Sequence, residues 1–160
     1  MGTEPATDGL YPVADLRAYL TGAWEIRRSL DDRLRGERGS FEGRATFSRG
    51  EDGTLAYREE GRLALGGFET LAHQRYHYAF PAFDRAPHRP PQRAEVRFAD
   101  GRPFHELDLG DGLWTAGHRC GADVYRGRFR AFGPDRWWVR WIVTGPLKDQ
   151  ALESLFTRAS

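Results

Sequence analysis

Residues 117–125 read GHRCGADVY, a stretch that decides how this part of the chain folds. A glycine-alanine pair lies between two runs of alternating residues, and this pattern predicts a β-hairpin with a two-residue turn. Such a turn fixes the register of the hairpin, because the numbers of facing residues add up to a constant. We therefore expect Tyr125 to face His118. By the same count, Asp123 faces Cys120.

The alternation of this hairpin recurs along most of the chain. A period of two residues is typical of strands that bury one side. The nine predicted strands cover residues 24–30, 41–47, 55–59, 68–78, 94–98, 103–109, 114–120, 125–129 and 137–143. Short turns between most of them predict consecutive pairing in an antiparallel meander. Closure of that meander into a barrel would remove its exposed edges, so we predict an all-β barrel.

The two ends of the chain lack this alternation. We predict that residues 1–11 are a mobile leader and that residues 12–160 form a single β-barrel domain. A short helix is expected between Pro12 and Gly22. A second, C-terminal helix is expected over residues 150–158, where three apolar residues share one side. The proline-rich connection between the fourth and fifth strands is interpreted as a flap over an opening.

Composition excludes several function classes. The formal net charge is +1, with 24 basic and 23 acidic residues, so we expect no nucleic-acid partner and no membrane partner. An outward basic row of Arg126, Arg128 and Arg130 favours nucleic-acid binding, but acidic residues on neighbouring strands offset it. No apolar run is long enough to span a bilayer. A single cysteine and the lack of an apolar run after Met1 predict a cytoplasmic protein. We expect a monomer or a homodimer.

Turn geometry predicts a polar wall in the C-terminal half of the barrel. A two-residue turn at residues 111–112 would set His105 opposite His118, and a similar turn at residues 100–101 would set Val96 opposite His105. Charged residues fill the other face of these strands, so that face belongs in water. The side chains expected to point inward are His105, His118, Cys120, Asp123 and Tyr125.

A second polar wall is predicted in the N-terminal half. With a turn at residues 66–67, the expected inward pairs are Glu59 with Gln74 and Tyr57 with Tyr76. Arg28 and Glu59 are expected to meet across Gly43. Burial of a charge is unfavourable by several kcal/mol unless it is paired, so we expect Arg28 and Glu59 to partner each other, a ligand or trapped water.

Several spaced motifs resemble a bacterial family known as domain of unknown function 6314. They are Trp24-Glu25-Ile26-Arg27-Arg28, Asp100-Gly101-Arg102-Pro103-Phe104-His105, His118-x-Cys120-x-x-Asp123-x-Tyr125 and Gly145-Pro146-x-Lys148-Asp149. The likeness runs from about Leu16 to Arg158. The segment YLTGAW, residues 19–24, resembles the opening of lipocalin-type (calycin-type) barrels. The resemblance implies a lipocalin-like barrel and brings no established activity. The disulfide pair and export signal of secreted lipocalins are absent, which argues against an extracellular carrier.

The first functional hypothesis is a binding protein. An enclosed, aromatic-lined space with a few converging polar groups is the usual composition of a small-molecule site. We expect a partly apolar ligand that carries a polar or anionic group, and we expect no cofactor. The candidate ligand-binding residues are Trp24, Arg28, Tyr57, Glu59, Gln74, Tyr76, His105, His118, Cys120, Tyr125 and Trp141.

Two further hypotheses stay open at this point. In a cofactor-independent isomerase, cyclase or hydrolase, His118 would act as general base, hydrogen-bonded to Tyr125 or backed by Asp123. In a metal- or haem-binding barrel, His105, His118 and Cys120 would be the ligands. The His-x-Cys spacing is not a standard zinc spacing, so we expect no metal. Whether the protein is an enzyme is left undecided by the residues.

Overall fold

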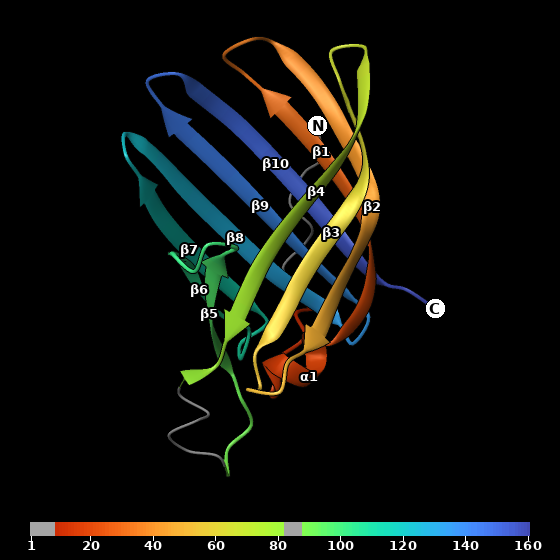
Figure 1. The fold of residues 1–160 in the computed structure, drawn as a ribbon, viewed down its shortest axis with the longest axis vertical. Coiled ribbons are helices and arrows are strands. Elements are labelled where there is room, and N and C mark those ends of the chain that lie inside the picture. Colours follow the sequence, from red (N-terminus) through yellow and green to blue (C-terminus); the bar gives the residue numbers. More distant parts are fainter. Residues whose placement is uncertain (1–8, 82–87) are drawn as a thin grey trace.

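The computed structural model of the chain describes residues 9–81 and 88–160. Within these residues, ten antiparallel strands form one sheet that curls into a barrel, and a short helix lies at one end (Figure 1). The elements are α1 (Leu16–Leu20), β1 (Gly22–Asp32), β2 (Glu37–Arg49), β3 (Leu55–Leu65), β4 (Phe68–Ala79), β5 (Arg93–Phe98), β6 (Pro103–Asp108), β7 (Leu113–Cys120), β8 (Asp123–Gly133), β9 (Arg136–Gly145) and β10 (Lys148–Arg158). The predicted all-β meander is confirmed, with ten strands where nine were expected.

The barrel closes through its first and last strands. β1 pairs with β2 on one side and with β10 on the other, and the sheet runs in the order β6-β5-β4-β3-β2-β1-β10-β9-β8-β7. The two edge strands are therefore β6 and β7, from the middle of the chain. They lie side by side, but no backbone ladder joins them in the described sheet. We call this line of contact the β6–β7 seam.

The predicted C-terminal helix is wrong. Residues 150–158 belong to β10, which follows β9 through a tight turn and pairs with both β9 and β1. The apolar spacing of this segment fits a helix, but Leu152, Ser154 and Phe156 also alternate and line the interior of the barrel. A strand at this place satisfies the backbone groups of β1 and β9 at once, which a packed helix could not do.

The predicted hairpin with a turn at residues 111–112 is also wrong. Gly112 N donates to Leu109 O at 2.9 Å, so the central residues of this turn are Gly110 and Asp111, one position earlier than predicted. Leu109 O accepts a second hydrogen bond from Val13 N, and Gly112 O accepts one from Ala131 N. These backbone groups bind the N-terminal segment and β8 instead of continuing a β6–β7 ladder. His105 and His118 are consequently not a cross-strand pair.

A side-chain hydrogen bond and ring contacts join the seam in place of a ladder. Trp114 Nε1 on β7 donates to Glu106 O on β6 at 2.8 Å. The Phe104 ring on β6 contacts the rings of His118 on β7 and Tyr125 on β8, with centroids 5.3 and 6.0 Å away. Among the described residues, the seam is therefore closed by ring packing and by the hydrogen bond from Trp114.

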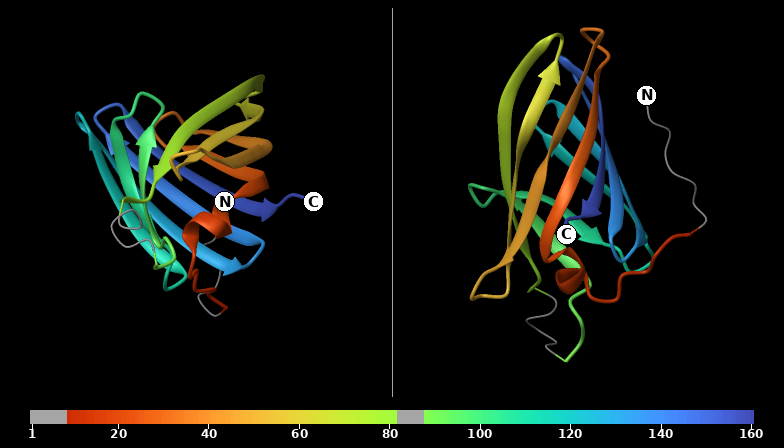
Figure 2. Two further views of the ribbon diagram at one scale, coloured as in Figure 1. Left: turned by 60° about the horizontal axis from the view of Figure 1, so that its bottom comes forward. Right: turned by 90° about the vertical axis from the view of Figure 1, so that its right-hand side faces the viewer.

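Helix α1 lies across one end of the barrel (Figure 2). Asp15 caps it, since its Oδ1 accepts from Ala18 N at 3.0 Å, and the side chains of Leu16, Tyr19 and Leu20 are buried beneath it. The short helix predicted between Pro12 and Gly22 is confirmed. We call this the closed end, and the end with the β1–β2, β3–β4 and β9–β10 turns the open end.

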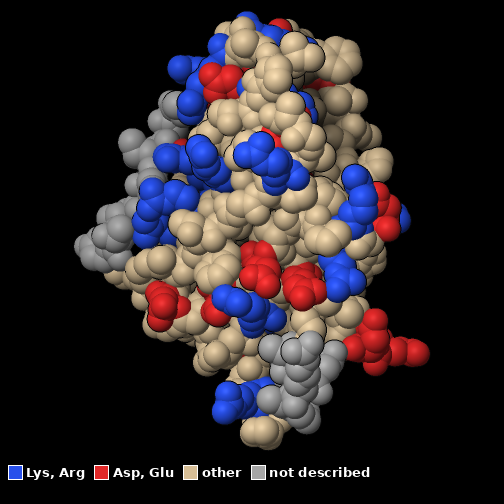
Figure 3. Space-filling view, turned by 90° about the vertical axis from the view of Figure 1, so that its left-hand side faces the viewer, with Lys and Arg blue, Asp and Glu red and all other residues tan. Residues whose placement is uncertain are grey.

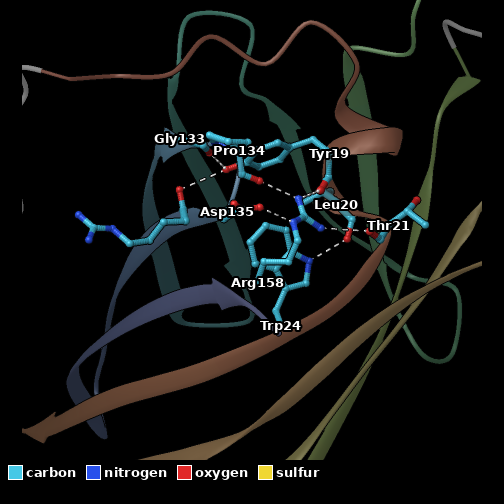
Figure 4. A network of polar contacts seen from close by, with 9 residues as sticks. Tyr19, Leu20, Thr21, Trp24, Gly133, Pro134, Asp135 and Arg158 are labelled. Atoms are coloured by element: carbon cyan, nitrogen blue, oxygen red, sulfur yellow. Dashed lines mark hydrogen bonds and ion pairs between the residues drawn. The ribbon is translucent and has the colours of Figure 1, made fainter. Parts of the chain in front are cut away.

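Arg158 ties the closed end together (Figure 4). Its guanidinium donates to Tyr19 O at 2.9 Å, Pro134 O at 2.8 Å and Thr21 O at 3.3 Å, and forms an ion pair with Asp135 at 2.9 Å. The same group lies 4.1 Å from the ring centroid of Trp24, a cation–π contact. The last strand is thereby bonded to α1 and to the β8–β9 turn.

Two predicted segments, the N-terminal leader and the flap between β4 and β5, are described only in part. Residues 1–8 of the predicted leader lie outside the described residues, while Tyr11 N donates to Ala131 O at 2.9 Å. Residues 82–87 of the predicted flap also lie outside the described residues. Among the described residues, no helix has the length and apolar character needed to cross a membrane.

Candidate functional site

An irregularity in β6 turns two neighbouring aromatic side chains toward the interior. Val96 pairs with His105 as predicted, but Arg97 pairs with Pro103, so Phe104 has no partner on β5. Such a β-bulge re-aims side chains. Phe104 and His105 both line the interior of the barrel as a result. The Phe104 ring stacks on Trp141 of β9, with centroids 5.1 Å apart and planes at 21°.

The interior holds a cavity of about 320 Å³. Aromatic rings from opposite sides of the barrel line it, and Trp137 and Phe156 stack in parallel with centroids 3.8 Å apart. The lining residues at the open end include Gln74 and His73, which are exposed to solvent. The volume falls at the small end of the range of about 300–1,000 Å³ that is usual for ligand pockets.

One charged pair lies in the wall of this cavity. Arg28 Nη1 donates to Glu59 Oε2 at 2.7 Å, and Nη2 donates to Oε1 at 3.1 Å. Tyr57 Oη donates to the same Oε1 at 2.6 Å, and Arg28 Nε donates to Ser154 Oγ at 2.7 Å. The Glu59 side chain is 6% exposed, so its charge depends on these partners. We call these four residues the Arg28 network.

Glycine at position 43 lets the network cross β2. Arg28 pairs with Phe41 on β2, and Glu59 of β3 pairs with Ala45, so their bridge runs diagonally over Gly43. A Cβ atom at Gly43 would lie 2.7 Å from the Phe41 ring and 2.5 Å from Glu60 O. No larger residue fits, and the predicted meeting of Arg28 and Glu59 across Gly43 is confirmed.

Burial and the ion pair fix the protonation states of the network. Burial disfavours the charged form of Arg28, but the hydrogen bonds and charge of Glu59 outweigh it and raise the pKa of Arg28. Burial, followed by the charge of Glu59, raises the pKa of Tyr57 well above its usual value. The same two causes raise the pKa of Tyr76 to about 12. At neutral pH the tyrosines are therefore protonated donors, and Arg28 is a cation.

Two further polar atoms belong to residues of the cavity wall. His105 Nδ1 lies 2.7 Å from Glu106 O, and burial lowers the pKa of His105 to about 4. A carbonyl oxygen only accepts, so the neutral ring carries its proton on Nδ1 and leaves Nε2 as an acceptor. Trp137 is 2% exposed, and its buried Nε1 has no hydrogen-bond partner among the described residues.

Comparison with known proteins places the chain in a family. The profile described as "Family of unknown function (DUF6314)" matches residues 20–158. The chain belongs to the DUF6314 family. No curated protein matches this DUF6314 chain.

Solved structures share the fold of the DUF6314 chain. It is similar to the S-type phycobiliprotein lyase of Guillardia theta, at 11% identity and a TM-score of 0.63, over 98% of this chain and 99% of that chain. It is also similar to a DUF3598-family protein of unknown function from Nostoc punctiforme, at 9% identity and a TM-score of 0.59, over 94% of this chain and 51% of that chain. Likeness at such identities shows the fold alone, which is a lipocalin-like barrel.

The predicted ligand-binding residues of the DUF6314 chain separate into two groups. Seven of them line the cavity: Arg28, Tyr57, Glu59, Gln74, Tyr76, His105 and Trp141. Their predicted pairings, Glu59 with Gln74 and Tyr57 with Tyr76, are confirmed. Trp24 lies outside the cavity lining and belongs to the closed end, where its Nε1 donates to Leu20 O at 2.8 Å.

The remaining three candidates lie beside the cavity or away from it. His118 and Tyr125 face each other as predicted, and both contact Phe104, but neither lines the cavity of the DUF6314 barrel. Cys120 faces Asp123 as predicted, yet it is exposed at the end of β7. The expected inward position of Cys120 is wrong, because β7 extends past the neighbouring strands β5 and β6 at the open end (Figure 1).

The candidate catalytic residues do not form the expected relay. The His118 and Tyr125 ring centroids are 5.9 Å apart in an edge-on arrangement. Asp123 forms an ion pair with Lys148 at 3.3 Å. The nearby Tyr125, followed by the hydrogen bond to Asp123, raises the pKa of Lys148. The carboxylate that would back His118 in an enzyme is thus bound to the lysine.

Three of the lining residues that sequence analysis missed show why it missed them. Ser154 was hidden by the predicted helix, although the alternation of residues 150–156 is a signal that could have found it. Phe104 was not among the candidates, because strict alternation with the inward His105 would turn it outward and a bulge leaves no trace in an alternating pattern. Trp137 was recognised as a strand residue, but its unpaired Nε1 depends on packing that no local pattern encodes.

Two alternatives gain no support from the geometry. Among the described residues, His, Cys, Asp and Glu side chains form no group of three or more that could hold a metal ion. In the predicted basic row, Arg126 and Arg128 are exposed, but Arg130 is 5% exposed and pairs in register with Trp138. Figure 3 shows both signs of charge on the face over the seam. The DUF6314 chain therefore presents a cavity as its best-defined site.

Proposed function

We propose that the protein binds a small, partly apolar organic molecule inside the barrel. The Arg28 network would bond the polar group of this ligand, and the rings of Phe104, Phe129 and Trp141 would cover its apolar part. The observation that carries the proposal is the buried ion pair of Arg28 and Glu59 in the wall of a cavity of about 320 Å³.

The energetics of the ion pair support this proposal. Replacing a buried ion pair by well-packed apolar residues is often neutral or stabilising, so the pair is a poor device for stability alone. The hydrogen bonds to Glu59 and Ser154 use three of the five N–H groups of Arg28. The other two N–H groups are donors that a ligand in the cavity would accept from.

The experiment uses N-phenyl-1-naphthylamine, a small neutral fluorescent probe. We expect a saturable, one-to-one rise in its fluorescence, with energy transfer from Trp141 and Trp137. The variant Ala72→Trp would fill the cavity from β4 and abolish binding. The control Ala56→Trp adds the same ring at an exposed position of β3 and should bind as the wild type does. Absence of saturable binding, or equal binding by both variants, would contradict the proposal.

A native ligand can be sought in parallel. Protein purified from its own host is examined by native mass spectrometry, with Ala72→Trp as the reference. The proposal expects an added mass on the wild type that the filled variant lacks.

The single cysteine supports a reducing compartment such as the cytoplasm as the place of this function. Cell fractionation with an antibody to the protein would test that location, and size-exclusion chromatography with light scattering would distinguish the monomer from the homodimer.

A further inference from the structure

The polar atoms of the cavity wall define which ligand chemistry fits. Among the lining residues, the side chains with formal charge at neutral pH are Arg28 and Glu59, and they neutralise each other. The Glu59 carboxylate already accepts three hydrogen bonds, from Arg28 and Tyr57. A guest that carried a net charge would lose its hydration without finding an opposite charge to compensate it.

Besides the two remaining N–H groups of Arg28, the cavity wall has a hydrogen-bond donor and an acceptor that the described residues do not use. Trp137 Nε1 is a buried donor without a partner among the described residues. His105 presents Nε2 as an acceptor, since Nδ1 donates to Glu106 O. Both residues contact the Phe129 ring, with centroid distances of 5.4 Å for His105 and 6.4 Å for Trp137. One small molecule lying against Phe129 could therefore reach both.

The walls themselves are flat. Phe104 and Trp141 stack at 21°, and Trp137 and Phe156 stack at 3°. Aromatic faces of this kind favour planar guests, which keep the largest contact area at the smallest loss of conformational freedom.

We infer that the ligand is a neutral, planar ring compound with a hydrogen-bond acceptor beside a hydrogen-bond donor, as in a lactam or an aromatic carboxamide. The acceptor bonds to Trp137 Nε1 and the donor bonds to His105 Nε2. This inference rests on the proposed binding function and narrows it, because it excludes the anionic ligand that the sequence left open.

Four probes of one shape test the inference: naphthalene, 2-acetonaphthone, 2-naphthamide and 2-naphthoate. The ketone has the acceptor alone, the amide has acceptor and donor, and the carboxylate is an anion at pH 7.5. Affinities are measured by displacement of N-phenyl-1-naphthylamine from the wild type. We expect the affinity to fall in the order amide, ketone, hydrocarbon, carboxylate. Each hydrogen bond gained should raise the affinity by about three- to tenfold.

Two variants separate the two hydrogen bonds. Trp137→Phe should weaken the binding of the amide and of the ketone by about three- to tenfold each and leave the binding of naphthalene unchanged. His105→Phe should weaken the amide and leave the ketone unchanged. The matched control is Trp138→Phe, which removes an indole N–H from a neighbouring residue of β9 that does not line the cavity.

The outcomes distinguish the two proposals. Failure of every probe, including N-phenyl-1-naphthylamine and naphthalene, would overturn the binding function itself. Tightest binding of 2-naphthoate by a wild type that also binds naphthalene would leave the binding function in place and overturn the inference. The ranking on the wild type decides the question of charge even if a variant fails to fold.

Discussion

Arg158 and Arg28 are both held by hydrogen bonds inside one barrel, yet their partners differ in kind. Arg158 at the closed end bonds to three backbone carbonyls as well as to the Asp135 carboxylate, and it covers Trp24. Arg28 in the cavity bonds to two side chains, Glu59 and Ser154. If Arg158 is replaced, the backbone carbonyls that accept its hydrogen bonds stay in place without a donor. If Arg28 is replaced, the side chains that accept its hydrogen bonds can be replaced as well. The first arginine therefore holds the fold, and the second shapes the interior.

The largest effect is expected at the closed end. Arg158→Met should lower the free energy of unfolding by about 3 kcal/mol, because it leaves the Tyr19 and Thr21 carbonyls without their donor. Urea denaturation measures the change. Arg44→Met, at an exposed position of β2, is the control and should stay within about 0.5 kcal/mol of the wild type. If Arg158→Met and Arg44→Met changed the free energy of unfolding equally, Arg158 would not hold the fold and would no longer differ from Arg28 in this respect.

The cavity arginine should behave differently in a double-mutant cycle. Glu59→Leu alone leaves the Arg28 charge buried and should cost about 3 kcal/mol. Combined with Arg28→Met, the same substitution should return the stability to within about 1 kcal/mol of the wild type. Chemical denaturation of the four proteins gives the coupling. A double variant as unstable as Glu59→Leu would show that the Arg28 network holds the fold after all.

A smaller effect is expected from the titration of His105. Its pKa is about 4 in the folded chain and about 6.5 in the unfolded chain, so the unfolded chain binds the proton first as the pH falls. The stabilisation is complete above pH 6.5 and is lost toward pH 4, which amounts to about 2 to 3 kcal/mol. Denaturation curves of the wild type and of His105→Phe at several pH values measure this: the free energy of unfolding of the wild type, relative to that of the variant, should fall by this amount between pH 6.5 and pH 4. If the free energies of unfolding of the two proteins changed in parallel with pH, the lowered pKa of His105 in the folded chain would be contradicted.

The smallest effect is expected at Cys120. This residue is exposed at the end of β7, so Cys120→Ser should change the stability by less than about 0.5 kcal/mol. The thiol of the folded wild type should react fully with Ellman's reagent without denaturant. A thiol that reacts only after unfolding would place Cys120 in the interior, where the sequence had placed it.

Local turn chemistry made a large part of the site predictable. The turn at residues 66–67 and the turn after Cys120 fix their registers without help from the rest of the molecule. From them followed the facing pairs on both walls, and from Gly43 the meeting of Arg28 with Glu59. These predictions depend on neighbours in sequence, which is why one sequence was sufficient.

The errors arose where distant segments compete for backbone groups. The carbonyl groups of Leu109 and Gly112, at the two ends of one turn, accept hydrogen bonds from Val13 N and Ala131 N, and neither donor is local to the turn. Residues 150–158 carry a spacing that fits a helix and a strand equally well, and the need of β1 and β9 for a partner decides between them. Phe104 faces inward because of a bulge in its pairing with β5.

The β6–β7 seam has a kinetic consequence. Where a ladder joins two neighbouring strands of the sheet, parting them means breaking a series of backbone hydrogen bonds. Parting β6 from β7 means giving up the bond from Trp114 to Glu106 and the ring contacts of Phe104. The wall can spread along this line while the other strands stay paired. For the proposed ligand, entry and exit would then depend on the seam, whereas the lifetime of the folded chain would depend on the paired strands.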